Sequence, residues 1–283
     1  MDENEQHFLW EFFAMDIIVC IKQVPDVPNI RLDEHRMTII REGVEGIINP
    51  LDCVALEAAV NLRERQGGRI TVLSMGPPQS EEALREALAF GADQAILLTD
   101  PAFAGADTLA TSHVLATAIS MLKPFPDLVI CGRQTIDSDT GHVGPQIAEE
   151  LDLPQVCGVN EIHPQGDSLV VKRLYDGFQD TFRVNTPALL TVSQDLSSPH
   201  HIPLGDLQRA FSDREIIRWA IKDLNLKPEE VGLGGSATRV WKLRKAASKR
   251  RGEIVTGSTQ SLVEHVIRKL EALSILDEES GNG

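Results

Sequence analysis

A polar segment over residues 132–145 holds the side chains best suited to binding a phosphorylated ligand. Asp137 and Asp139 can accept hydrogen bonds from ribose or adenine, while Thr140 and His142 can donate to phosphate oxygens. The segment follows an apolar run and precedes residues with helical spacing, so it joins a strand end to a helix start. Such a junction presents free N–H groups and the positive end of a helix dipole, and its glycines let the backbone approach a ligand closely. The pattern predicts a phosphate or diphosphate site.

The same residues have a simpler interpretation. Hydrophilic connections between strands and helices are common, and Asp139 or Thr140 could serve only as the N-cap of the following helix. The elements on either side of the segment are needed to choose between the two.

Strands and helices alternate around this segment. Short apolar runs predict strands at residues 16–21, 69–74, 94–98 and 128–131, and helical spacing predicts helices at residues 53–65, 80–90, 107–122 and 146–151. Asn49 is expected to be the N-cap of the first helix. Alternating strands and helices form a parallel sheet with helices on both faces. The predicted class is α/β, with a doubly wound, Rossmann-like parallel sheet.

Ligands of such sheets bind at the carboxyl ends of the strands. The residues expected at that edge are Cys20, Asn49, Met75, Gly76, Asp107, Thr108 and the loop that begins at Gly132. Together they predict a site for one adenine nucleotide. The sequence has neither a G-x-G-x-x-G fingerprint nor a P-loop, so the site differs from both of those nucleotide-binding motifs.

In the second half of the chain the alternation of strands and helices gives way to consecutive strands. A β meander is predicted from strands at residues 155–162, 168–175, 179–184 and 188–192. The chain then reads as irregular to about residue 228, as an extended arm over residues 229–242, and as a helix over residues 258–273. An arm with so little core of its own is stable only on another protein, which implies a partner subunit.

Composition narrows the class of protein. The net charge of −15 argues against nucleic acid as a partner, although a basic run over residues 239–251 could be a docking face or only a solvated one. No apolar run approaches the roughly 20 residues that a membrane span requires. The four cysteines are far apart and suit reduced, buried thiols in a cytoplasmic protein. Adjacent His200 and His201 lack a third ligand, so no metal site is predicted.

Several motifs, taken in order, resemble one family. They are residues 19–26, 48–52, 72–77, 105–108 and 132–145, followed by residues 171–177 leading to residues 186–188. In this order they resemble the beta subunit of electron-transfer flavoprotein, over about residues 15–241. Phe178 departs from the pattern, since the family usually has Gly or an acid there. The resemblance implies an adenine nucleotide alpha-hydrolase-like sheet with the meander added to it.

The resemblance also implies partners and cofactors. The beta subunit would form a heterodimer with an alpha subunit that carries its own FAD, and would itself hold AMP or a second FAD. The implied contacts are Cys20, Asn49, Pro50, Leu51, Asp52, Met75, Gly132, Arg133, Gln134, Thr135, Ile136, Asp137, Ser138, Asp139, Thr140, Gly141, His142 and Val143. Residues 137–145 and the arm at 231–238 look like the branch with FAD in the beta site, where Arg133 or Lys22 could offset the added charge.

The implied domain plan has four parts. Residues 1–14 are expected to be a disordered extension or a misplaced start, and residues 15–195 the nucleotide-binding domain. Residues 196–227 would hold the partner-recognition loop, with Leu204 as the anchor for a dehydrogenase, and residues 228–283 an arm and helix that dock on the alpha subunit. Residues 197–201 depart from the family pattern. Of the properties that the resemblance implies, the identity of the partner is therefore the least transferable to this chain.

Two function classes follow. The first is an electron carrier between an acyl-CoA dehydrogenase, as in fatty acid β-oxidation, and a further acceptor, either a membrane quinone oxidoreductase or, in a bifurcating protein, NADH and a low-potential carrier. The second is a stand-alone adenine-nucleotide sensor of the universal-stress type, which would share the sheet. A sensor has no need of the meander, the Leu204 loop or the arm, and no hydrolase triad is found in a plausible order.

Overall fold

A computed structural model describes residues 14–26, 31–33, 38–40, 46–241 and 252–275 of the protein. The chain divides into two compact units, with the boundary after residue 242. The first unit contains the sheet, and the second contains one described helix, α7 (Thr259–Ala272), close to its predicted range. Within the described residues, every helix is too short or too polar to cross a lipid bilayer.

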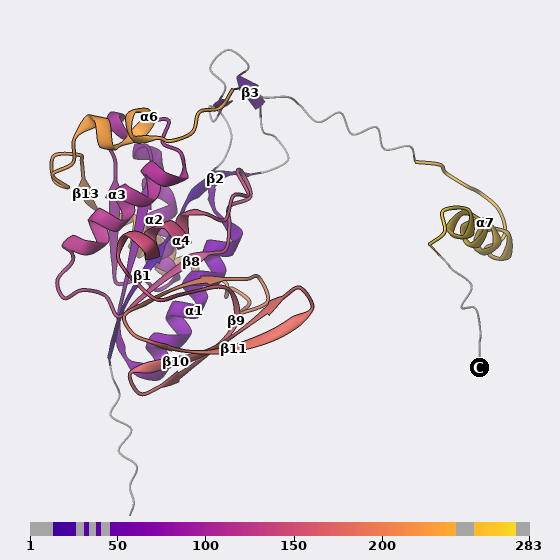
Figure 1. The fold of residues 1–283 in the computed structure, drawn as a ribbon, viewed down its shortest axis with the longest axis horizontal. Coiled ribbons are helices and arrows are strands. Elements are labelled where there is room, and N and C mark those ends of the chain that lie inside the picture. The colour runs from indigo at the N-terminus through magenta and orange to yellow at the C-terminus, as the bar shows by residue number, and fades with distance from the viewer. Residues whose placement is uncertain (1–13, 27–30, 34–37, 41–45, 242–251, 276–283) are drawn as a thin grey trace, which may run out of the picture. The chain divides into compact units, whose positions relative to one another are not determined.

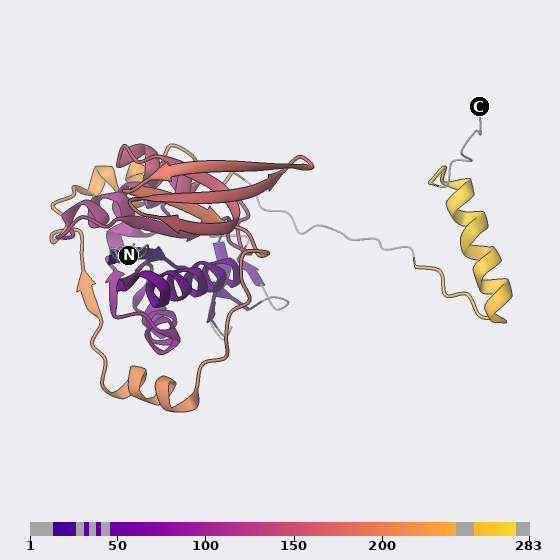
Figure 2. The same cartoon turned by 90° about the horizontal axis from the view of Figure 1, so that it is seen from below.

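A nine-stranded sheet forms the centre of the first unit (Figures 1 and 2). From one edge to the other its strands are β11 (Phe178–Asn185), β10 (Ser168–Tyr175), β9 (Gln155–Gln165), β12 (Ala188–Val192), β8 (Leu128–Gly132), β1 (Met15–Cys20), β6 (Gly68–Met75), β7 (Gln94–Leu98) and β13 (Ile217–Trp219). The strands from β9 to β13 in this order pair in parallel, and the two remaining pairs, β9 with β10 and β10 with β11, are antiparallel.

Helices cover both faces of this sheet, and each face has its own apolar core. On one face α1 (Pro50–Gln66) and α2 (Glu81–Phe90) pack with Ile17 and Val19 of β1. On the other face α3 (Thr108–Met121) and α4 (Val143–Glu150) pack with Ile18 and Cys20. The alternation of side chains along a buried strand therefore supplies both cores. The predicted doubly wound α/β fold is confirmed.

The strand order reverses between β1 and β8. From β1 the chain builds outwards through α1, β6, α2 and β7, and α3 then returns it to β8 on the opposite side of β1. The connections after β1 and after β8 consequently leave the sheet toward different faces. In doubly wound sheets a ligand crevice lies at such a switch point, outside the carboxyl ends of the two strands.

The predicted meander is only partly correct. β9, β10 and β11 are consecutive neighbours, but β12 does not follow β11 at the edge; it inserts between β8 and β9 and pairs in parallel with both. All its residues are buried, as expected for a central strand covered on both faces. The prediction missed this because a short apolar run looks the same in an edge hairpin and in a sheet centre.

The segment predicted to be irregular contains two elements. α5 (Leu204–Ser212) packs against α2, and β13 extends the parallel sheet beyond β7. β13 has three residues, too few to show a period in the sequence. Residues 196–227 therefore include structure that completes the domain.

The first part of the predicted arm is also more compact than expected. It forms η3 (Pro228–Glu230) and α6 (Gly232–Gly235), and Val231 between them is 1% exposed in the core shared with α3. Residue 242, the end of the predicted arm, lies outside the described residues. The remaining short elements are β2 (Gln23–Pro25) with β5 (Gly46–Ile48), β3 (Arg31–Asp33) with β4 (Thr38–Ile40), η1 (Pro78–Ser80) and η2 (Pro101–Phe103).

Candidate functional site

Asn49 connects the end of β1 to the loop that follows β8. Its side chain is fully buried, and its Nδ2 donates to the carbonyl of Gln134 at 3.0 Å while its Oδ1 accepts from the N–H of Ile136 at 3.1 Å. Its own N–H donates to the carbonyl of Lys22 at 2.9 Å. Asn49 occupies the N-cap position of α1, as predicted, but its side chain makes no capping hydrogen bond. The amide shapes the loop instead.

Asp52, in the first turn of α1, lies below the same loop. Its Oδ2 accepts from the N–H of Lys22 at 2.8 Å, and its Oδ1 accepts from the N–H of Gly132 at 3.2 Å. A Cβ on Gly132 would overlap this carboxylate, so only glycine fits there. Burial raises the pKa of Asp52 to about 7, against the opposing effects of hydrogen bonds from Asn49, Lys22 and Gly132 and of the Lys22 ammonium.

Asp137 is held inside its own loop. Its side chain is 5% exposed, and its two carboxylate oxygens lie 2.8 and 2.7 Å from Nζ of Lys22. The hydroxyl of Thr135 donates to the same carboxylate at 2.7 Å. Asp137 therefore fixes the loop, and its contact with ribose or adenine stays a prediction.

The second half of the loop has an unusual backbone. Asp139 and Gly141 have positive φ values of 56° and 66°, and the N–H of Asp139 donates to the carbonyl of Thr135 at 2.8 Å. The side chains of Gln134 and Asp139 are hydrogen-bonded to each other. α4 begins at Val143, directly after His142 and three residues before the predicted start. The first N–H groups of a helix lack partners within it, so this end of the loop suits a phosphate.

Two thiols lie beneath the loop. Cys20 of β1 and Cys131 of β8 are register neighbours, and both are buried. A hydrogen bond with Cys20 and burial raise the pKa of Cys131 well above its usual value. Cys131 is therefore a neutral thiol at physiological pH and contributes to packing. Cys20 is 8% exposed and lies where the predicted crevice begins.

The other predicted residues lie at the end of β6 and in the connection from β7 to α3. Met75 ends β6, and the N–H of Gly76 donates to the carbonyl of Leu98 at 3.0 Å. Asp107 caps α3, which begins at Thr108, by accepting from the N–H of Ala110 at 3.0 Å. The second oxygen of Asp107 accepts from the N–H and the hydroxyl of Thr238, at 2.8 and 2.9 Å. Asp107 thus holds residues of the predicted arm.

A pocket of about 260 Å³ adjoins the loop on the side of β9, β10 and β12. Its lining residues are Arg133, Gln134, Thr140, Gly141, Cys157, Gly158, Arg173, Leu174, Tyr175 and Thr191. The guanidinium of Arg173 is paired with Asp180 at 3.0 Å and lies over the ring of Tyr175. Sites for whole small molecules usually measure about 300–1,000 Å³, so this pocket suits part of a larger ligand.

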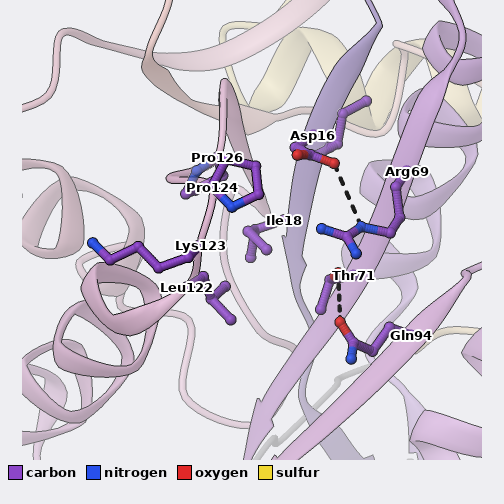
Figure 3. Close-up of a pocket in the computed structure, with 10 residues that line it drawn as sticks. Asp16, Ile18, Arg69, Thr71, Gln94, Leu122, Lys123, Pro124 and Pro126 are labelled. Atoms are coloured by element: carbon purple, nitrogen blue, oxygen red, sulfur yellow. Dashed lines mark hydrogen bonds and ion pairs between the residues drawn. The ribbon is translucent and has the colours of Figure 1, made fainter.

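A second pocket, of about 210 Å³, lies at the opposite end of the strands (Figure 3). It is lined by Asp16 and Arg69, at the starts of β1 and β6, and by Thr71, Gln94 and residues of the connection before β8. Arg69 is paired with Asp16 at 3.4 Å, and Figure 3 shows Lys123 pointing away from that pair. The predicted nucleotide residues lie at the other edge, so this pocket is separate from them.

Leu204 is strongly exposed, as its predicted role requires. It is the first residue of α5, directly after Pro203, and is 80% exposed, while Leu207 of the same helix packs on the core. The preceding segment is tied down, because Nδ1 of His200 lies 2.7 Å from Glu57 of α1. Among the described residues no group of three or more His, Cys, Asp or Glu side chains could hold a metal ion.

Sequence reasoning missed how the site is held together. It treated Lys22 only as a possible partner for added phosphate charge, and it gave no structural role to Asp52. The sequence did offer one signal: Asp52 is an acid in the first turn of a helix whose inward-facing residues are otherwise apolar. A buried acid there needs donors from neighbouring segments.

Comparisons with known proteins agree with this architecture. The sequence pattern described as "Electron transfer flavoprotein domain" matches residues 36–223. The electron transfer flavoprotein subunit beta of Thermoanaerobacterium thermosaccharolyticum is 46% identical over 262 residues, which cover 93% of this chain and 100% of that protein. The caffeyl-CoA reductase-Etf complex subunit CarD of Acetobacterium woodii is 44% identical over 87% of this chain and 93% of its own. Protein FixA of Azorhizobium caulinodans is 45% identical over 80% of this chain and 83% of its own.

Proposed function

Because this chain belongs to the electron transfer flavoprotein family, as a beta subunit, we propose that the switch point between β1 and β8 holds FAD rather than AMP. Beta subunits of this family work with an alpha subunit, and the family is associated with flavin and nucleotide. FAD bound here would supply the electron-transfer chemistry, and this chain would bind and orient it. A stand-alone nucleotide sensor is not favoured by these relatives.

The observation that carries the choice of FAD is the pocket beside the loop. A single phosphate at the start of α4 would complete AMP, whereas a diphosphate must continue past it. The pocket of about 260 Å³ offers a continuation, since it begins at Thr140 and Gly141 and includes Arg133 and Arg173. A guanidinium matches phosphate oxygens in geometry and charge. Lys22 is already paired with Asp137, so Arg133 is the better candidate to offset the second phosphate.

The chain's own residues would then have distinct tasks. Asn49, Asp52 and Lys22 hold the loop in shape from below. The backbone near Gly141 and the start of α4 would receive phosphate. The predicted contacts Cys20 and Met75, at the ends of the neighbouring strands β1 and β6, and Thr108, at the start of α3, would line the adenosine side of the crevice.

We further propose that the heterodimer exchanges electrons with an acyl-CoA dehydrogenase, and that Leu204 anchors this partner. An exposed leucine at a helix start, fixed by Leu207 and by the His200–Glu57 contact, is well presented to a small apolar pocket. One relative is named as a subunit of a caffeyl-CoA reductase complex, which fits a partner that handles CoA esters. The further acceptor would be a membrane quinone oxidoreductase or, in a bifurcating protein, NADH and a low-potential carrier.

The nucleotides released from the purified heterodimer test the proposal. We would co-express the chain with its alpha subunit, denature the complex in acid and separate the products by chromatography. About two FAD per heterodimer supports FAD in the beta site. One FAD with one AMP would show instead that the protein is a one-flavin carrier. Bleaching of bound flavin by NADH tests bifurcation separately.

A further inference from the structure

Asp52 is the point at which three segments of the crevice meet. Its carboxylate accepts backbone N–H groups from Lys22, after β1, and from Gly132, at the end of β8. The side chain of Asn49 also hydrogen-bonds to it. Lys22 lies 30 residues before Asp52 in the chain, and Gly132 lies 80 residues after it. One buried acid therefore sets the spacing across the switch point.

We propose that Asp52 is a positioning residue whose ionised form holds the start of the loop over residues 132–142 in its ligand-binding shape, and whose protonation loosens that loop and weakens nucleotide retention. The residue acts through the loop and does not itself contact the ligand. The inference rests on the proposed nucleotide site, but it does not depend on whether the nucleotide is FAD or AMP.

The number of acceptor sites explains the effect. An ionised carboxylate has two oxygens that both accept, and here both receive a backbone N–H. A protonated acid keeps one good acceptor and gains a donor, so either Lys22 or Gly132 loses its partner. Losing the partner of a buried N–H is costly, and the chain relieves that cost by moving. Gly132 is the first residue of the loop, so the loop moves with it.

The surroundings place this change within the physiological range. Burial raises the pKa of Asp52 to about 7, although the donors from Asn49, Lys22 and Gly132 and the Lys22 ammonium oppose the rise. Two thiols, those of Cys53 and Cys131, also lie close to Asp52. Burial and the neighbouring Asp52 raise the pKa of Cys53 to about 11, and that of Cys131 is raised well above its usual value. Both thiols therefore stay neutral between pH 6 and 8.

Nucleotide release from the heterodimer at several pH values tests the proposal. The bound nucleotide would be followed by chromatography after dilution and filtration at pH 6, 7 and 8, in the wild type and in Asp52→Asn, which mimics the protonated acid. Asp16→Asn is the matched control, because Asp16 lies at the opposite end of the strands. The chemical identity of the released nucleotide tests the proposed FAD separately, on the same samples.

We expect the wild type to lose nucleotide about tenfold faster at pH 6 than at pH 8, and Asp52→Asn to lose it fast at both. Asp16→Asn should behave as the wild type. A wild-type pH profile retained in Asp52→Asn, or slower loss at pH 6, would overturn the proposal.

Amide hydrogen exchange in the wild type gives a second measurement if Asp52→Asn does not fold. After correction for the intrinsic pH dependence of exchange, the N–H groups of Gly132 and Ile136 should be less protected at pH 6 than at pH 8. Equal protection at the two pH values would contradict the proposal.

Discussion

Nζ of Lys22 lies 2.7 Å from Oδ2 of Asp137, although the two residues are 115 positions apart in the chain. Lys22 follows β1 and Asp137 lies in the loop after β8, so the pair bridges the two strands between which the order of the sheet reverses. The aspartate is nearly buried and the lysine is partly exposed. The pair therefore closes one side of the crevice with a charge contact that solvent only partly screens.

Replacing Lys22 with Met should loosen the loop by leaving the carboxylate of Asp137 without its cation. We expect a loss of about 1–2 kcal/mol in the free energy of unfolding, less than for a fully buried pair because Lys22 is partly solvated. Chemical denaturation of the heterodimer measures this. Arg69→Met is the matched control: it breaks the more exposed pair with Asp16 and should cost less than about 0.5 kcal/mol. Equal losses would refute a special role for Lys22.

Replacing Arg133 with Gln should weaken FAD binding in the beta site about tenfold, because a charged hydrogen bond to the second phosphate is lost. AMP, which has one phosphate, should be affected much less. Equilibrium dialysis of each nucleotide against the deflavinated heterodimer gives both constants. Arg183→Gln, which removes a guanidinium bonded to Gln165, serves as a control for the change in charge. An equal effect of Arg133→Gln on the two nucleotides would contradict the placement of the diphosphate.

Leu204→Ala should leave thermal stability unchanged and slow electron exchange with the partner dehydrogenase. Its side chain is 80% exposed, so truncation leaves no cavity. Leu207→Ala, on the same helix, should instead lower stability by about 1–3 kcal/mol, because Leu207 packs on the core. Stopped-flow kinetics and thermal melts of both variants separate the two roles. A fall in stability for Leu204→Ala with unchanged kinetics would make it a packing residue.

Thr238→Ala should release the first part of the arm from α3, since it removes the hydroxyl that donates to Asp107. We expect faster protease cleavage within residues 228–241 and a loss of about 1 kcal/mol. Burial opposes the ionisation of Asp107, but bonds from Ala110 and Thr238 outweigh it and hold its pKa below the usual value. Because the pKa of Asp107 is lowered, its carboxylate stays ionised and keeps its hydrogen bonds from Thr238 above about pH 4, and these bonds weaken only below that pH. Cleavage should therefore not change between pH 5 and 8, and a steep change in that range would contradict this.

Asp52 should make the stability of the protein fall as pH rises from about 4 to about 7. Its pKa is raised from 3.8 to about 7, so in this window the folded chain holds a proton that the unfolded chain has released. The contribution should decrease by up to about 1.4 kcal/mol per pH unit and level off above about pH 8. Asp52→Asn should remove this slope. Denaturation curves of both proteins at pH 5, 6, 7 and 8 measure the difference, and identical slopes would mean that the acid ionises normally.

The parts of the fold that local periodicity encodes were predictable. Helices α1, α2 and α3 and strands β1, β6, β7 and β8 lie within a few residues of their predicted ranges. The position of β12 was not predictable, because its pairing with β8 and β9 depends on contacts far apart in sequence. β13 was missed because its strand conformation depends on pairing with β7, and its own three residues are too few to show a pattern.

The candidate site shows the same division. Asn49 and the loop after β8 were identified by residue type and position, yet the use of Asn49 to hold that loop, and not to cap α1, needed the geometry. Asp107 has the type of a ligand residue, but its oxygens are taken up by Ala110 and Thr238. Residue type indicates what a side chain can bond to, and only the fold decides which of several partners it meets.

The insertion of β12 also has a consequence for synthesis of the chain. β8 and β9 leave the ribosome before the strand that must lie between them, while the hairpin of β10 and β11 can pair locally as soon as it emerges. A nascent chain that ends before residue 188 therefore leaves the facing edges of β8 and β9 unpaired, and unpaired edges are templates for strands of other chains. Completion of residues 188–192 is thus the step that closes the edges of β8 and β9.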